Sequence, residues 1–93
     1  QIKEIKTALA QIGAMRPGSL TRQYKDPRAQ RGPYYQLSYT LDMKSRTEYI
    51  RREHLPEVRR QISAYRRFKT LTSQWVALSI ERSRLAIKEA NVP

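Results

Sequence analysis

Arginine side chains at seven-residue spacing are the groups in this sequence best placed to do chemistry. The pairs are Arg52 and Arg59, Arg59 and Arg66, and Arg60 and Arg67, with Lys69 close behind. On a helix, side chains seven positions apart stack along one face, and no Asp or Glu between Glu57 and Glu81 neutralises them. Because the planar guanidinium group pairs with phosphate or guanine, the pattern predicts a cationic face for nucleic acid. The alternative is that the charges only keep a helix face solvated.

A second basic group comes earlier in the chain. It consists of Arg22, Lys25, Arg28 and Arg31, followed by Tyr34 and Tyr35. Cations interleaved with aromatic rings can hold a nucleic-acid backbone and stack on bases. Tyr35, Tyr39 and Tyr49 are expected in the core, because aromatic residues that alternate along a strand usually pack a sheet face. Tyr34 is then the better candidate for an exposed contact with nucleic acid.

A predicted hairpin supplies a third group. A two-stranded ribbon fits the major groove of DNA, and the side chains that could point outward from it are Arg46, Lys44, Glu48 and Gln36. Ordinary cross-strand pairing of the same residues is the alternative. Arg46 therefore joins the candidate nucleic-acid-binding residues.

The residue types needed for catalysis or metal binding are scarce. The chain has no cysteine and a single histidine, His54, which we interpret as a capping or surface residue at the start of a helix. Asp26 and Asp42 each fall in a predicted turn, where Asp serves local hydrogen bonds. The three glycines are isolated and form no phosphate-binding loop. We therefore expect no enzymatic activity, no cofactor and no metal.

Net charge narrows the class of partner. The 93 residues include 19 Lys and Arg against 8 Asp and Glu, which gives a formal charge of +11. Such a chain attracts polyanions, and we expect nucleic acid, with DNA favoured over RNA, in the cytoplasm. The length fits one small domain over residues 1–93. No apolar run is long enough to span a bilayer, so we expect no membrane partner, and an acidic membrane surface is a weaker alternative.

Hydrophobic spacing predicts an α+β fold. Ile2, Ile5, Leu9 and Ile12 recur at helical spacing and predict a helix over residues 1–13. Residues 19–51 form the β region, with an antiparallel hairpin from strands 34–41 and 45–51, a third strand at 19–24, and a loop at 25–33 that contains two prolines. Residues 53–91 predict one long helix, or two with a bend, that pairs with the first helix.

The long predicted helix has more apolar surface than the rest of the chain can cover. Its apolar seam runs from Leu55 to Leu85 at spacings of three and four, with a slip at 65–71. Because the first helix and the hairpin are short, the surface centred on Trp75 and Leu78 predicts a bend or self-association. The second functional hypothesis is therefore an oligomeric helical adaptor that forms a homodimer through this helix.

Four short stretches of the sequence are distinctive. They are Arg16-Pro17-Gly18-Ser19-Leu20 with the following Arg22-Gln23-Tyr24, Gly32-Pro33-Tyr34-Tyr35, Lys44-Ser45-Arg46-Thr47, and Tyr65-Arg66-Arg67-Phe68. Together they resemble a small prokaryotic domain family of unknown function whose members are often found near mobile elements. Many relatives have a cysteine-rich loop before the Gly-Pro-Tyr-Tyr step, which this chain lacks, so the resemblance implies no metal here. Sheet and helix together are also similar, at the level of fold, to the arm-binding domains of phage integrases.

Overall fold

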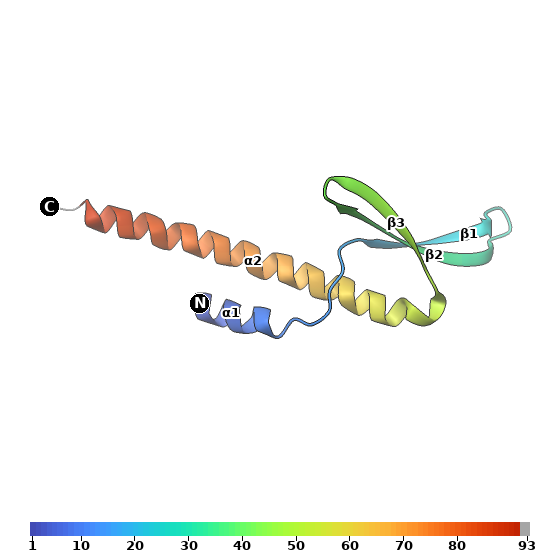
Figure 1. Cartoon of the computed structure of the whole chain (residues 1–93), viewed down its shortest axis with the longest axis horizontal. Coiled ribbons are helices and arrows are strands. Elements are labelled where there is room, and N and C mark those ends of the chain that lie inside the picture. Colours follow the sequence, from blue (N-terminus) through green and yellow to red (C-terminus); the bar gives the residue numbers. More distant parts are fainter. Residues whose placement is uncertain (92–93) are drawn as a thin grey trace. The chain divides into compact units, whose positions relative to one another are not determined.

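The computed structural model describes residues 1–91 and has the α+β fold that the sequence predicts. The elements, in chain order, are α1 (Ile2–Ala10), β1 (Ser19–Asp26), β2 (Arg31–Leu41), β3 (Lys44–Ile50), the 3-10 turn η1 (Arg52–His54) and α2 (Leu55–Ala90) (Figure 1). Contacts divide the chain into two compact units. The sheet unit is Ala14–Tyr65, and the helical unit is Gln1–Gly13 with the part of α2 from Arg66 onward.

Three antiparallel strands in the order β1-β2-β3 make up the sheet. Leu20 of β1 pairs with Leu37 of β2, and Tyr35 of β2 pairs with Ile50 of β3. The segment 19–24, predicted as a third strand, is therefore confirmed and continues to Asp26. This register places the alternating apolar residues of all three strands on one face.

The predicted loop over residues 25–33 is wrong. β1 and β2 stay paired as far as Asp26 and Arg31, so only residues 27–30 form the turn. Oδ1 of Asp26 accepts a hydrogen bond from the backbone N–H of Ala29 at 3.3 Å, which closes the turn locally. Pro33 is tolerated within β2 because β3 pairs with β2 only from Tyr35 onward, so β2 has a free edge at Pro33.

Asp42 and Met43 form the second turn of the sheet. Both have positive φ, 53° and 64°. Two central residues with positive φ are typical of the tight hairpin turn whose twist matches the strands that it joins. The predicted turn at Asp42 is thus confirmed, although Lys44 already belongs to β3.

One face of the sheet packs against the first turns of α2 (Figure 1). Leu37 is fully buried, and the buried residues around it are Ile50, Leu55, Val58 and Ile62, with Leu20, Tyr35 and Tyr39 packed against them. The predicted core face of β2 is therefore confirmed for Tyr35, Leu37 and Tyr39. Leu41 is 49% exposed, because it lies at the hairpin turn beyond the last core contact of the sheet.

A glycine allows the segment before β1 to pass close to this core. Gly18 has a φ of +128°, and a Cβ there would lie 2.7 Å from the carbonyl oxygen of Ser38 and 2.9 Å from Cδ1 of Leu37. Only glycine accommodates both the dihedral angle and the close approach. Nearby, the backbone N–H of Arg16 donates to the carbonyl oxygen of Gln61 at 3.0 Å, which ties the segment to α2.

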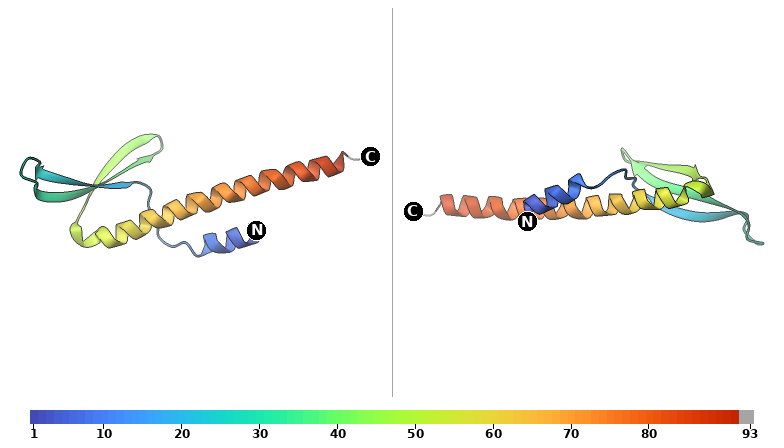
Figure 2. Two further views of the ribbon diagram at one scale, coloured as in Figure 1. Left: turned by 180° about the vertical axis from the view of Figure 1, so that it is seen from behind. Right: turned by 90° about the horizontal axis from the view of Figure 1, so that it is seen from below.

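In the helical unit, α1 lies antiparallel to α2 (Figure 2). Lys6 Nζ sits 5.1 Å from the centroid of the Trp75 ring, and Ile5 is buried. The pairing of the two helices that the sequence predicts is therefore confirmed. The predicted end of the first helix at residue 13 is too late, because Gln11 and Ile12 donate to carbonyls three residues back and tighten the last turn after Ala10.

α2 is one continuous helix, which settles the alternative of two helices with a bend. It begins at Leu55 rather than at residue 53, because Arg52–His54 form the 3-10 turn η1. Pro56 falls in the first helical turn, where a missing N–H costs no helical hydrogen bond. Pro93, predicted to close the helix, lies outside the described residues.

Replacing Leu37 by Ala should destabilise the sheet unit by about 2–5 kcal/mol, since it removes a fully buried side chain and leaves a cavity. Urea denaturation followed by circular dichroism measures the change. Leu41→Ala is the matched control: the same atoms are removed from an exposed site of the same strand. Equal losses for the two variants would contradict the core assignment.

Candidate nucleic-acid interface

The basic segment of α2 comprises Arg59, Arg60, Arg66, Arg67 and Lys69, all of them exposed. All five belong to α2, with Arg59 and Arg60 in the sheet unit and the other three in the helical unit. The stacking of residues seven apart along one face stays a prediction. Arg59, Arg66 and Arg67 form no ion pair with any residue of the described part of the chain. Their charges are therefore available to an external anion.

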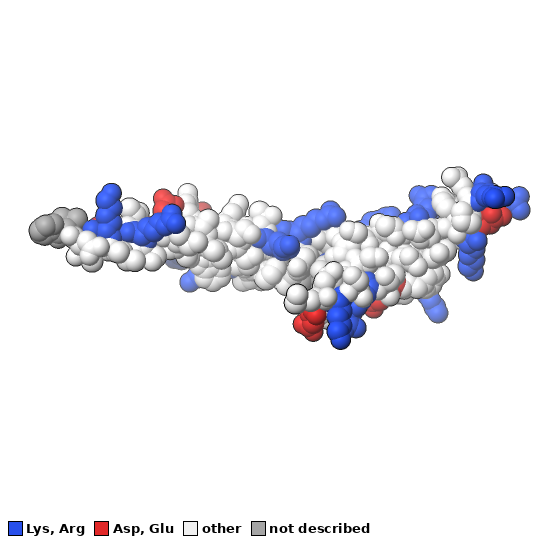
Figure 3. All heavy atoms as spheres, turned by 90° about the horizontal axis from the view of Figure 1, so that it is seen from above, with Lys and Arg blue, Asp and Glu red and all other residues white. Residues whose placement is uncertain are grey.

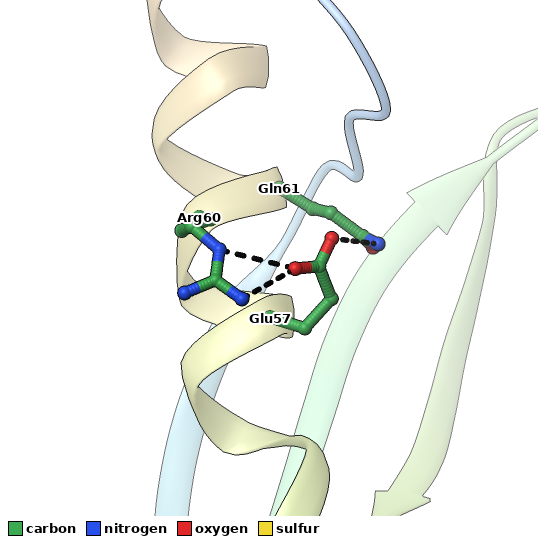
Figure 4. Close-up of polar contacts among 3 residues, drawn as sticks. All are labelled: Glu57, Arg60 and Gln61. Carbon is green, nitrogen blue, oxygen red and sulfur yellow. Dashed lines mark hydrogen bonds and ion pairs between the residues drawn. The ribbon is translucent and has the colours of Figure 1, made fainter.

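Arg60 is the exception within the basic segment. Its Nε and Nη2 atoms donate to Oε2 of Glu57 at 3.0 and 2.6 Å, and Nε2 of Gln61 donates to Oε1 of the same carboxylate at 3.2 Å (Figure 4). The prediction that no acidic residue neutralises the arginines of this segment is thus wrong at Arg60, because the carboxylate of Glu57, one turn earlier, pairs with it. The ion pair is exposed on both sides, so it competes with water and is weak.

These contacts change the pKa of the Glu57 carboxyl. The hydrogen bonds from Arg60, then that from Gln61, and the positive charge of Arg60 lower the pKa of the Glu57 carboxyl, because each favours its charged form. The group that compensates Arg60 is therefore charged at neutral pH and becomes neutral only in acid.

Arg52 does not belong to the arginine rows of the helix. It lies in η1, before α2 begins, so the predicted stacking of Arg52 with Arg59 is wrong. The 3-10 turn changes the rise and rotation per residue, and side chains seven apart across it no longer share a helical face. Arg52 remains exposed.

The early basic group lies around the turn between β1 and β2. Lys25, Arg28 and Arg31 are exposed, and within residues 1–91 they form no ion pair. The carboxylate beside them, Asp26, accepts the backbone N–H of Ala29 instead. Three cations thus stand at one end of the sheet without an ion pair among the described residues, beside the single carboxylate of Asp26.

Arg22 is separated from this turn by its place on β1. It pairs with Tyr35 across the sheet, and its Nη1 donates to the hydroxyl oxygen of Tyr24 at 3.2 Å. This hydrogen bond raises the pKa of Arg22 above its already high value, so the side chain stays charged.

The tyrosines divide between the two faces of the sheet. Tyr35 and Tyr39 pack on the core, as predicted, but Tyr49 is 64% exposed, so its predicted core position is wrong. Ile50 takes the core position of β3, and the alternation of a strand sends the neighbouring Tyr49 to the opposite face. The Tyr49 ring lies 6.4 Å from that of the half-buried Tyr34, at an interplanar angle of 36°.

The predicted outward-pointing set of the hairpin is also divided between faces. Lys44, Arg46 and Glu48 alternate with Tyr49 and so share the side of the sheet on which Leu37 is buried, whereas Gln36 is on the other side. Arg46 pairs with Tyr39 near the turn and is exposed. The four residues therefore do not form one groove-reading surface.

Arg16 begins the first of the stretches that carry the family resemblance, but it was not among the candidate site residues. It forms an ion pair with Glu48, and its guanidinium carbon lies 5.3 Å from the centroid of the Tyr39 ring. These contacts give the Glu48 carboxylate a partner within the sheet unit. The only sequence signal would have been a lone acidic residue among the basic residues of the hairpin.

Clusters suited to metal binding or membrane insertion are not found in the part of the chain that the structure describes. No three His, Asp or Glu side chains within residues 1–91 come together in a group that could hold a metal ion. None of the helices among those residues has the length and apolar character that a membrane-spanning segment needs.

The structure defines a small basic α+β domain with exposed Lys and Arg side chains on a helix and at a sheet turn (Figure 3). Residues 1–60 match the protein family described as "Domain of unknown function (DUF6788)", and the chain belongs to this family. That match agrees with the expected membership of a family of unknown function. Comparisons with curated proteins and with solved structures find no match.

Replacing Arg60 by Gln should raise the pKa of Glu57 toward its ordinary value, because the strongest hydrogen bonds to the carboxylate are lost. Carbon-13 NMR of the Glu57 carboxyl as a function of pH measures the change. Since the pKa is depressed in the folded state, the contribution to stability is present above the unfolded pKa and is lost as the pH falls through the folded value. Arg59→Gln removes a charge that is not bonded to Glu57, and an equal shift in that control would contradict the assignment.

Proposed function

We propose that this chain is a non-enzymatic nucleic-acid-binding module, with DNA favoured over RNA, that acts in the cytoplasm. The observation that supports the proposal most directly is the stretch from residue 58 to residue 80, which contains no acidic side chain. Arg59, Arg66 and Arg67 are exposed in this stretch and have no ion-pair partner in the described residues. The resemblance to domains found near mobile elements is consistent with a role in DNA transactions.

Electrostatics favour a phosphate backbone as the ligand of these side chains. A nucleic acid presents regularly spaced negative charges with a condensed layer of counterions, and each phosphate that a cation neutralises releases counterions to solution. A net charge of +11 on 93 residues attracts such a polyanion over several ångströms. The contribution is independent of sequence, so the basic segment would supply affinity rather than base specificity.

The turn between β1 and β2 is the second element of the proposed interface. Lys25, Arg28 and Arg31 extend from it, and the local carboxylate is engaged by the turn itself. A tight turn with three exposed cations can approach phosphates without burying any charge of its own. Arg22, Arg46 and Arg52 would add long-range attraction, since each is exposed.

Replacing Arg59, Arg66 and Arg67 together by Gln should weaken binding to duplex DNA and flatten its salt dependence. Each lost phosphate contact reduces the slope of log K against log salt concentration by about 0.9. Fluorescence anisotropy with a labelled duplex at several salt concentrations measures both quantities.

A matched control removes three cations from the last turns of the same helix. Arg82, Arg84 and Lys88 are exposed there and lie among the acidic residues Glu81 and Glu89. The triple Gln variant has the same net charge as the test variant but should keep most of the salt slope. Equal loss in both variants would show that only net charge matters, and salt-independent binding by the wild type would overturn the proposal.

An oligomeric helical adaptor is the second candidate function, and exposed apolar residues of α2 favour it. Val76, Ile80 and Ile87 are spaced by four and seven and are 58%, 46% and 60% exposed. Trp75 and Leu78, on which the sequence centred this surface, are instead half-buried, and Lys6 of α1 covers the Trp75 ring. A homodimer would therefore use the stripe of Val76, Ile80 and Ile87.

Replacing Ile80 by Lys should abolish any self-association through this stripe, because it places a charge at the centre of an apolar contact. Sedimentation velocity at several protein concentrations provides the measurement. Thr70→Lys adds the same charge to an exposed position of the same helix, roughly 80° or more around the helix axis from the stripe. If the wild type sediments as a monomer at every concentration, the adaptor function is excluded.

A further inference from the structure

The sheet has one face that its own fold does not use. This open face is the side opposite Leu37, and its residues are Thr21 and Gln23 of β1, Tyr34, Gln36, Ser38 and Thr40 of β2, and Ser45, Thr47 and Tyr49 of β3. All of them are uncharged and all can form hydrogen bonds. In a chain with 29% charged residues, this side of the sheet has no aliphatic side chain, and its one charged residue within the strands is Lys25, at the end of β1.

The side chains of the open face have unused hydrogen-bonding capacity. None of them forms a hydrogen bond with another residue of the described part of the chain. Most are exposed, while Tyr34 and Gln36 are half-buried. The rings of Tyr34 and Tyr49 lie near each other on this face, and most of Tyr49 stays accessible. The face thus offers donors, acceptors and an aromatic surface to an external molecule.

Charge complementarity indicates which molecule fits this face. Cations stand at one end of it, since Lys25 continues the outward-facing positions of β1 and the turn with Arg28 follows. The Glu48 carboxylate belongs to the opposite face, where Arg16 pairs with it. A ligand with uncharged hydrogen-bonding rings and a connected anionic chain would place its rings on the sheet and its anions at the turn.

Nucleic-acid bases have these properties, and stacking requires that they be unpaired. In a duplex the flat faces of the bases are hidden, and phosphates border both sides of the groove. In a single strand every base has a face free to stack on an aromatic side chain, and its pairing edge is free for Gln, Ser and Thr.

We infer that the open face binds the unpaired bases of a single-stranded nucleic acid, with one base stacked on Tyr49 and the phosphates beside Lys25 and Arg28. The inference rests on the proposed function and names the form of nucleic acid that this site takes. The arginines of α2 would bind phosphates without distinguishing single from double strands, whereas the open face would favour the single strand.

Three fluorescein-labelled probes of equal length test the inference by anisotropy with the full chain at one low salt concentration. They are an oligothymidine strand, an abasic strand with the same phosphates but no bases, and a DNA duplex. The wild type should bind oligothymidine more tightly than either other probe. Tyr49→Ala should weaken oligothymidine binding by roughly 5- to 150-fold, the range that stacking of one base on an aromatic ring provides, and should leave abasic binding unchanged.

Two further variants make the result specific to the ring and the face. Tyr49→Phe keeps the ring and should retain most of the affinity, while Gln23→Ala, at an exposed position of β1, should cause a smaller loss on oligothymidine only. Thermal melting by circular dichroism checks that each variant is folded. If Tyr49→Ala melts early, Gln23→Ala still tests the open face.

The possible failures separate this inference from the proposed function. Equal affinity for oligothymidine and the abasic strand, or no effect of Tyr49→Ala and Gln23→Ala, overturns base binding while phosphate binding by the arginines stands. Tighter binding to the duplex than to the single strand also overturns the inference. If no probe binds, both the inference and the proposed function fail.

Discussion

Burial of Leu37 between the sheet and the first turns of α2 is the interaction on which the sheet unit depends. It is the only large side chain fully removed from solvent among the described residues, and a few apolar groups of α2 and β3 close around it. Full burial of one leucine contributes about 1.5–3 kcal/mol, so a core this small has little to spare. Three strands and one helix provide only enough apolar surface for one side of the sheet. The residues on the opposite side are therefore not needed for the core, so their types can be set by function.

The charged side chains also stay out of this small core. No polar or charged side chain is buried in the part of the chain that the structure describes, so folding fully desolvates none of the cations there. The two ion pairs found there, Arg16 with Glu48 and Arg60 with Glu57, use two of the few acids and leave most arginines uncompensated. Mutual repulsion among these cations opposes folding and is relieved when a polyanion binds. Ligand binding and stability should therefore be coupled in this protein.

Hydrophobic spacing and turn residues predicted most helices and strands correctly. The predictions that failed concern contacts that depend on the three-dimensional structure. The helical seam of Leu55, Val58 and Ile62 and the alternation through Leu37 depend on local spacing, which the sequence displays directly. Arg60 and Glu57 are three residues apart and so are neighbours on the helix, but the ion pair forms only when their side-chain rotamers bring the two groups together. The assignment of Tyr49 to the core was wrong because Tyr49 and Ile50 are neighbours on β3, point to opposite faces, and could each fill a core position. Only the burial of Ile50 against α2 shows which face of β3 is the core face.

Strand alternation also bears on the two kinds of contact, with phosphates and with bases, that we propose for this protein. Phosphate contacts need charge and tolerate loose geometry, so they suit exposed arginines on a helix and a turn. Base contacts need fixed positions, and side chains on a sheet are held at the spacing of the strands. In this chain cations lie on α2, at the turn between β1 and β2, and on the core side of the sheet at Arg22, Lys44 and Arg46. The uncharged hydrogen-bonding groups lie on the opposite side of the sheet. Since one face of the sheet must be apolar to hold α2, base recognition can be built only on the other, and Tyr49 is placed there by the burial of Ile50.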